Sequence, residues 1–128
     1  MLDGATAHAT LPAIDMKRAA QFYTEKVGAV PEDAREGGAF FTVGDSRFSI
    51  YPTPNPNRGG HTQMGLQVPD VRAAVAELRS RGVVFEEYDF PGLKTVDGVA
   101  DMGDVTAAWF KDTEGNIVGV VHFAANAG

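Results

Sequence analysis

Histidines and a short acidic run are the side chains in this sequence best suited to chemistry. The chain has three histidines, His8, His61 and His122, and each can ligate a metal or act as a general base. The acidic residues between 86 and 89 offer another base, although a charge run at a strand edge is usually only solvated. Cysteine is absent, and there is no nucleophile elbow, phosphate-binding glycine loop or dinucleotide fingerprint. The options left are a metal site built on histidine, a metal-free base, and a pocket that binds without reacting.

The charge pattern excludes some classes of partner. Eleven Lys and Arg stand against seventeen Asp and Glu, giving a net charge of −6, and the basic residues are scattered. Because nucleic-acid backbones are bound by clustered Lys and Arg, we expect no nucleic-acid partner. No apolar run approaches the ~18 residues of a membrane span, and the first residues lack a basic, then apolar, leader pattern. We therefore expect a cytoplasmic protein with no membrane partner.

The elements that must position these residues occur in two similar halves. Residues 7–14 alternate apolar and polar side chains, which predicts a half-buried strand. Asp15 then predicts the N-cap of a helix over 16–27, and Gly28 its end. Strands are predicted over 30–35, 39–43 and 47–51, the last two joined by a tight turn at 44–45.

The second half repeats this order. Residues 53–60 are rich in Pro, Asn and Gly, which predicts a linker. Beyond it, Met64, Leu66 and Val68 alternate with polar or small residues, and Asp70 predicts a second helix cap 55 positions after Asp15. A helix over 71–81, ended by Gly82, and strands over 83–90, 105–111 and 117–123 complete the pattern, with residues 112–116 joining the last two strands. We expect one domain over 1–128, with module 1 at about 5–52, the linker at 53–60 and module 2 at about 61–124.

These motifs together resemble the glyoxalase/bleomycin resistance protein/dioxygenase superfamily, also called vicinal oxygen chelate proteins. The anchors are Leu11-Pro12-Ala13-Ile14-Asp15, Phe22-Tyr23 followed by Gly28, Val68-Pro69-Asp70, and the segment from Trp109 to Asn116. The resemblance implies an α+β fold in which two βαβββ modules form an eight-stranded, partly open barrel. It also implies a homodimer, either domain-swapped or side by side.

The resemblance also locates four positions at which many family members hold a divalent metal. By register, these positions carry His8, Ser49, Gln63 and Gly119. This set has one good ligand and no carboxylate, so an ion there would lack charge compensation. We therefore expect no metal and no cofactor, and the chain resembles most closely the metal-free, antibiotic-binding branch. His8 is then either a polar residue at a strand edge or a hydrogen-bonding wall of a pocket.

Aromatic residues stand beside two of these four positions. Pairing the last two strands about residues 113–115 sets Trp109 beside Gly119, and the matching pair in module 1 is Phe40 beside Ser49. An aromatic ring beside a small residue leaves a slot for a planar group, although both rings can instead simply fill the barrel. The stretch 88–98 has no periodicity and predicts a loop over the cavity mouth. The predicted ligand-binding residues are Trp109, Phe40, His8, Thr10, Tyr51, Ser49, Gln63, Gly119 and Phe90, with Thr42, Met64 and Val121 as further wall candidates and Met64 the least certain of these.

Two functions follow from this site, and catalytic residues are not identified. The first is a non-catalytic protein that binds a hydrophobic or aromatic small molecule, giving resistance by sequestering an aromatic, enediyne-type or bleomycin-type natural product. The alternative is a metal-dependent glyoxalase- or dioxygenase-type lyase, isomerase or oxidoreductase that uses His8 with Gln63 and His61. A metal-free enzyme with His8 as its general base is a third option.

Overall fold

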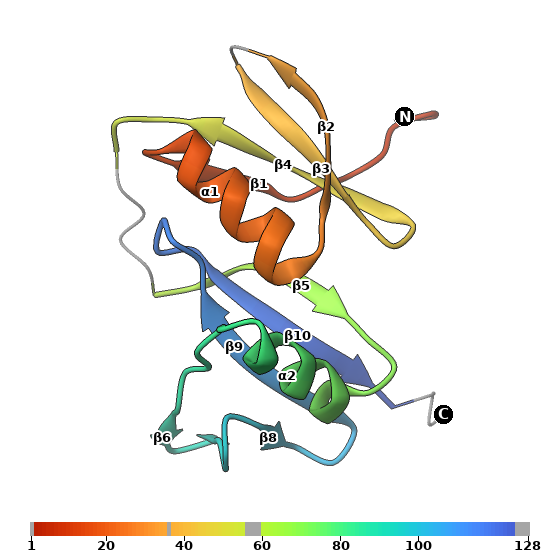
Figure 1. The fold of residues 1–128 in the computed structure, drawn as a ribbon. Helices are drawn as coiled ribbons and strands as arrows, with labels where there is room; N and C mark the ends of the chain where they lie inside the picture. The colour runs from red at the N-terminus through yellow and green to blue at the C-terminus, as the bar shows by residue number, and fades with distance from the viewer. Residues whose placement is uncertain (1, 36, 56–59, 125–128) are drawn as a thin grey trace.

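The computed structural model describes residues 2–35, 37–55 and 60–124, except for the side chains of residues 33–35. The predicted linker at 53–60 therefore lies partly outside the described residues. Figure 1 shows two modules one above the other, with α1 lying across the sheet of the first module and α2 in front of β9 and β10. The fold is α+β, as predicted, with two four-stranded sheets and two helices.

The first module follows the predicted order of elements. Asp15 caps its helix, because the Asp15 carboxylate accepts a hydrogen bond from the Arg18 backbone N–H at 3.0 Å. Gly28 ends the helical segment at φ 80°, a conformation that suits a residue without a Cβ. The first sheet has the strand order β1-β4-β3-β2. The elements are β1 (Thr10–Ala13), α1 (Met16–Phe22), the π-helix η1 (Tyr23–Val27), β2 (Val30–Arg35), β3 (Gly38–Val43) and β4 (Ser46–Pro52).

The second module repeats this arrangement. Asp70 caps α2 by accepting a hydrogen bond from the Ala73 backbone N–H at 3.1 Å. The second sheet has the order β5-β10-β9-β8, and its central hairpin has the predicted register, with Trp109 opposite Gly119. The elements are β5 (Thr62–Gln67), α2 (Val71–Ser80), β6 (Asp89–Phe90), β7 (Leu93–Lys94), β8 (Ala100–Asp101), β9 (Val105–Lys111) and β10 (Ile117–Phe123).

The prediction of a continuous strand over 83–90 is wrong. Only Phe85 and Glu86 pair with β9, through a bridge to Phe110 and a 2.8 Å hydrogen bond from the Glu86 N–H to the Trp109 carbonyl. The chain then leaves the sheet and forms the small β6–β7 hairpin. It returns as β8, which pairs with the other end of β9. Positive φ angles at Gly92, Asp97 and Gly98 turn the chain between β6 and β8.

Two other boundaries differ from the sequence prediction. The first strand spans 10–13 rather than 7–14, although the Ser49 N–H still donates to the Ala9 carbonyl. The first helix ends in the π-helical turn of η1. The two sheets are not joined into one barrel within the described chain, so each leaves the face opposite its helix without a covering sheet.

The β9–β10 loop fastens the second module to the first. The Glu114 carboxylate accepts hydrogen bonds from the backbone N–H groups of Ile14 and Asp15, at 2.9 and 3.0 Å, and from Arg18 Nε at 2.8 Å. Nearby, the buried Tyr23 hydroxyl donates to Asp112 at 2.6 Å. Burial and the charge of Asp112 raise the pKa of Tyr23 far above its usual value, so the hydroxyl remains a donor.

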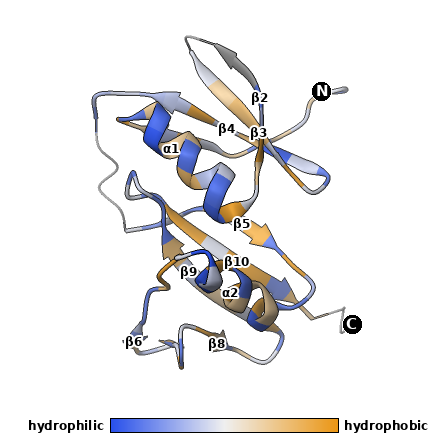
Figure 2. Cartoon of the chain, in the orientation of Figure 1, coloured by the Kyte–Doolittle hydropathy of each residue, from blue (hydrophilic) through white to orange (hydrophobic). Residues whose placement is uncertain are grey.

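One apolar core runs through both modules. Its largest fully buried side chains include Tyr23, Phe41 and Phe48 from the first module and Phe110 from the second. Figure 2 shows mostly hydrophobic colouring along β10, whereas α1 and α2 alternate between hydrophilic and hydrophobic residues. Each helix therefore buries one side against its sheet. None of the helices in the described ranges is long and apolar enough to cross a membrane.

Candidate functional site

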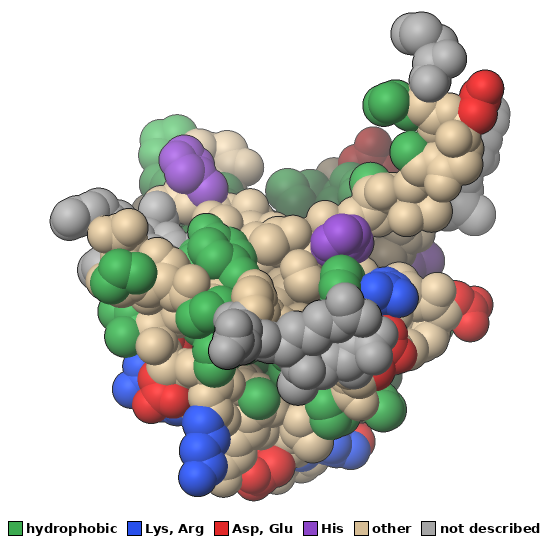
Figure 3. Space-filling model, turned by 90° about the horizontal axis from the view of Figure 1, so that it is seen from above, with side chains coloured by type: hydrophobic (Ala, Val, Ile, Leu, Met, Phe, Trp, Pro, Cys, Tyr) green, Lys and Arg blue, Asp and Glu red, His purple; other side chains and the backbone are tan. Residues whose placement is uncertain are grey.

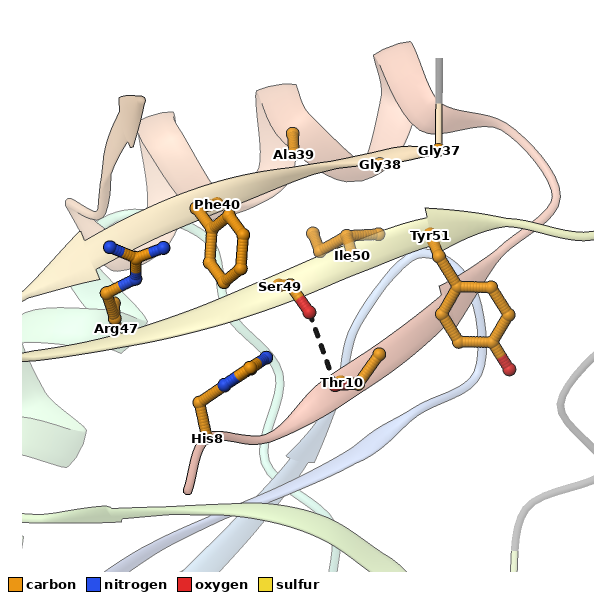
Figure 4. Close-up of a pocket in the computed structure, with 10 residues that line it drawn as sticks. All are labelled: His8, Thr10, Gly37, Gly38, Ala39, Phe40, Arg47, Ser49, Ile50 and Tyr51. Carbon is orange, nitrogen blue, oxygen red and sulfur yellow. Dashed lines mark hydrogen bonds between the residues drawn. The ribbon is translucent and has the colours of Figure 1, made fainter. Parts of the chain in front are cut away.

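The open face of the first sheet carries a cavity of about 500 Å³, which we call the first-sheet cavity. Alternation along β4 directs Phe48 and Ile50 mainly into the core. It turns Arg47, Ser49 and Tyr51 to this face. Figure 4 shows the side chains in a row, with Arg47 and Phe40 at one end and Tyr51 at the other. The lining residues are His8, Thr10, Gly37, Gly38, Ala39, Phe40, Arg47, Ser49, Ile50 and Tyr51.

The aromatic wall of this cavity is covered by a cation. The Arg47 guanidinium carbon lies 3.9 Å from the centroid of the Phe40 ring. The His8 ring contacts the same Phe40 ring in a T-shaped arrangement, with centroids 5.2 Å apart. Glu32, on β2 beyond the intervening strand β3, lies 3.5 Å from Arg47 and accepts a hydrogen bond from the Thr42 hydroxyl at 2.8 Å. A ligand approaching the covered face of Phe40 therefore meets the guanidinium first.

A smaller cavity of about 380 Å³ lies on the open face of the second sheet, and we call it the second-sheet cavity. Trp109 forms part of its wall, and its ring contacts that of Tyr88 with centroids 5.5 Å apart. Burial and the charge of Glu86 raise the pKa of Tyr88 above its usual value. The lining residues are Gly60, Thr62, Glu86, Tyr88, Phe90, Leu93, Trp109, Lys111 and Ile117.

The position expected to be vacant beside Trp109 is filled by Trp109 itself. A Cβ atom placed on Gly119 would lie 3.3 Å from the indole Nε1 and 3.5 Å from the Thr62 methyl group. The ring therefore lies over Gly119, and the glycine lets it approach the strand. The flat surface offered to a ligand is the outer side of the indole rather than a slot between Trp109 and Gly119.

The structure divides the predicted site residues between the two cavities. His8, Thr10, Phe40, Ser49 and Tyr51 line the first-sheet cavity together. Trp109 and Phe90 line the second-sheet cavity, and Gln63 and Gly119 line neither. Met64 is buried in the core, and neither Thr42 nor Val121 lines either cavity.

A β-bulge explains the position of Gln63. Ile117 and Val118 are neighbours on β10, yet they pair with Thr62 and Met64, so Gln63 is the extra residue of β5. Thr62 instead reaches the second-sheet cavity. Simple alternation backwards from Met64 cannot reveal this shift, because a bulge depends on the partner strand.

Arg47 is a cavity residue that the sequence reasoning missed, although a signal existed. Phe48 and Ile50 both face the core, so Arg47, Ser49 and Tyr51 must share the opposite face of the same strand. The alternation that identified Ser49 and Tyr51 therefore also indicates Arg47. Tyr88 and Leu93 gave no such signal, because they belong to the aperiodic segment 88–98.

The loop beside the second-sheet cavity is organised by one carboxylate. Glu87 accepts hydrogen bonds from the Thr95 hydroxyl at 2.6 Å and from the Gly98 N–H at 3.0 Å. These two donors, with Thr95 the stronger influence, lower the pKa of Glu87 below its usual value. Arg79 also ties the loop to α2, by donating to the Asp97 carbonyl at 3.0 Å. The predicted loop thus carries its own hydrogen-bonded structure and places Phe90 at the cavity.

The donor set at the family's metal positions does not fit a divalent ion. His8 offers an imidazole nitrogen, and its neighbours Thr10 and Ser49 offer hydroxyls whose oxygens lie 3.2 Å apart. In the second module, Gly119 has no side chain and Gln63 lies on the bulge. Divalent metal ions at such sites are bound by carboxylates or by several imidazoles. Across the described ranges, no cluster of three or more His, Asp or Glu residues is arranged to hold a metal.

Comparisons with known proteins agree with this architecture. Residues 5–120 match the model of the Glyoxalase/Bleomycin resistance protein/Dioxygenase superfamily. Among solved structures, UcmS2 shares 20% identity at a TM-score of 0.73, over 94% of this chain and 98% of that chain. A glyoxalase/bleomycin resistance protein/dioxygenase from Nocardioides shares 16% identity at a TM-score of 0.70, over 99% and 89% of the two chains. The fosfomycin resistance protein FosX from Listeria monocytogenes shares 13% identity at a TM-score of 0.71, over 97% of each chain.

Because the sequence identities are low, the likeness to these solved structures concerns the fold alone. No curated protein matches the sequence. The family model, in contrast, extends over both modules and includes the first strand, both capped helices and most of the last hairpin. Because the sequence match and the repeated βαβββ architecture agree over nearly the whole chain, this protein belongs to the glyoxalase/bleomycin resistance protein/dioxygenase superfamily.

Proposed function

We propose that the protein is a cytoplasmic, non-catalytic binding protein that sequesters an aromatic natural product, such as an enediyne-type or bleomycin-type antibiotic. The observation that carries the proposal is the first-sheet cavity. Its volume of about 500 Å³ is within the range of small-molecule pockets, and it combines two aromatic residues with a few hydrogen-bonding groups. The donor set at the family's metal positions supports binding rather than metal-dependent chemistry.

A homodimer completes this site in our proposal. The two cavities lie on different sheets and share no lining residue, so one chain offers two open half-sites. Strands β1 and β5 each stand at the edge of their sheet, with one side unpaired within the described chain. A second copy that brings its second-sheet cavity over the first-sheet cavity would enclose the ligand between Tyr51 of one copy and the indole of the other.

Calorimetric titration with 9,10-anthraquinone-2-carboxamide, a neutral planar probe, tests the binding proposal. We expect micromolar binding, with Tyr51→Ala weakening it by about 3- to 10-fold, as expected for one lost aromatic contact. Phe123→Ala is the matched control, because Phe123 is 52% exposed, Tyr51 is 40% exposed, and Phe123 lines neither cavity. Absence of binding, or an equal loss in both variants, would contradict the proposed site.

A second measurement separates sequestration from catalysis. We expect the probe to be recovered unchanged, by mass spectrometry, after prolonged incubation with the protein. Elemental analysis of untagged protein is the complementary test. Stoichiometric iron, manganese, nickel or zinc that disappears in the His8→Ala variant would overturn the non-catalytic reading.

A further inference from the structure

The first-sheet cavity has an unusual charge for this chain. The protein carries a net charge of −6, yet the cavity lining that the structure describes contains one arginine, one histidine and no carboxylate. The second-sheet cavity, in contrast, contains Glu86 and Lys111, whose charged atoms lie 3.7 Å apart. The two half-sites therefore differ in the charge that they favour.

Arg47 is positioned as a binding group rather than only as part of a surface ion pair. Its guanidinium lies against the Phe40 ring at 3.9 Å, and its Nη1 lies 3.5 Å from Glu32. The described contacts thus hold one face and one edge of the guanidinium. An arginine has five N–H donors in a planar fork, and the side chain remains 50% exposed, so the rest of the fork faces solvent at the cavity.

The other polar groups of the cavity complement a negative charge. Ser49 and Thr10 present hydroxyls in the middle of the row, and Tyr51 adds a phenol at its far end (Figure 4). The Ser49 hydroxyl donates to the Thr10 hydroxyl at 3.2 Å, which leaves the Thr10 and Tyr51 hydroxyls to donate to an acceptor on the ligand. Figure 3 shows a histidine and a basic side chain next to each other on the surface seen from above. An aromatic ligand with an acidic group can place its plane along the row and its anion at Arg47.

We propose that the ligand of this site is an anionic aromatic molecule, a planar carboxylic acid or ionised phenol, whose negative group is bound by Arg47. This proposal rests on the proposed binding function and specifies the ligand class. Glu32 competes for Arg47 and thereby limits the affinity for the anion.

Paired calorimetric titrations test the proposal. The probes are 9,10-anthraquinone-2-carboxylate and the corresponding carboxamide, which have similar shapes and differ in charge. We expect the carboxylate to bind about tenfold more tightly than the carboxamide, as one charge-assisted contact implies, and Arg47→Met to abolish this preference. Arg81→Met is the matched control, because Arg81 also forms an exposed ion pair, with Glu77 at 3.0 Å, and its loss changes the net charge equally.

A second variant separates ligand binding from a purely structural role for Arg47. If Arg47 binds the anion, Glu32→Gln removes its competitor and tightens carboxylate binding, opposite in sign to Arg47→Met. If the pair only supports the sheet, the two variants change carboxylate binding in the same direction, and the proposal fails. Equal binding of both probes by the wild-type protein also overturns it and leaves the binding function standing, whereas failure of both probes to bind contradicts the binding function itself.

Discussion

At the scale of single residues, neighbouring side chains decide how much of a predicted site residue is open to a ligand. Trp109 and Phe40 are both on the open faces of their sheets, as the pairing predicts. One ring lies over Gly119, and the other is covered by Arg47. The predicted pairs of aromatic and small residues are therefore present. The predicted slots are not open, because the indole fills the space over Gly119 and Arg47 covers the Phe40 ring.

Gly119→Ala tests the position of the indole. The added methyl group would lie 3.3 Å from the indole Nε1, so the ring must move outward by a few tenths of an ångström. Because Trp109 is only partly buried, we expect a shift of its fluorescence to longer wavelength and a change in unfolding free energy within about 1 kcal/mol. Gly65→Ala is the control, since nothing lies within 4 Å of a Cβ there. An unchanged spectrum in Gly119→Ala would show that the ring does not lie over the glycine.

At the scale of elements, the β9–β10 loop does more than join two strands. It carries Glu114 to the start of α1, where the carboxylate satisfies two backbone N–H groups and Arg18. Burial opposes ionisation of Glu114, but the hydrogen bonds from Arg18 and the Asp15 backbone prevail and lower its pKa below the usual value. One side chain thus connects the two modules and holds the residues just before α1.

Glu114→Gln is expected to change how stability depends on pH. A carboxylate with a lowered pKa stabilises the fold above its unfolded pKa of about 4.3, and this stabilisation is lost as the pH falls through the folded value. The variant should lose about 1 to 3 kcal/mol at pH 7 in urea unfolding and should show a flatter decline below pH ~4.3.

The control for this prediction is Glu25→Gln, which removes the same charge. Glu25 is exposed and forms no hydrogen bond or ion pair with the described part of the chain. Its variant should keep the wild-type dependence on pH. Equal curves for Glu114→Gln and the wild type would contradict the role assigned to Glu114.

At the scale of the whole molecule, the two modules share a core but leave two open faces. Their cavities lie on separate sheets, one lined by Arg47 and His8 and the other by Glu86 and Lys111. We propose that a symmetric dimer encloses both, because each copy then supplies the half-site that the other lacks. Such a dimer has two identical sites.

Mixing two variants that each bind the ligand weakly tests whether the dimer builds the site. Arg47→Met damages the first-sheet cavity and Trp109→Ala the second, so each pure variant should bind the anthraquinone carboxylate weakly. After the two are refolded together in equal amounts, about one quarter of the sites should combine two intact halves and regain tight binding by calorimetry. No recovery, in a mixture that light scattering shows to be dimeric, would mean that each site is built within one chain.

The sequence by itself determined the local elements of this protein. The Asp15 and Asp70 caps, the helix ends at Gly28 and Gly82, and the register of the last hairpin depend on neighbouring residues and on period-two alternation, so they could be predicted. The same alternation placed His8, Ser49 and Tyr51 on one face.

Only the tertiary structure decided what depends on contacts between distant residues. The bulge at Gln63 requires β10, the split outer strand of the second sheet requires β9, and the position of Glu114 requires the first module. The cation over Phe40 likewise arises where β3 and β4 bring two side chains together. Periodicity assigns a residue to a face, but the neighbours that cover it on that face are set by packing and charge across the sheet.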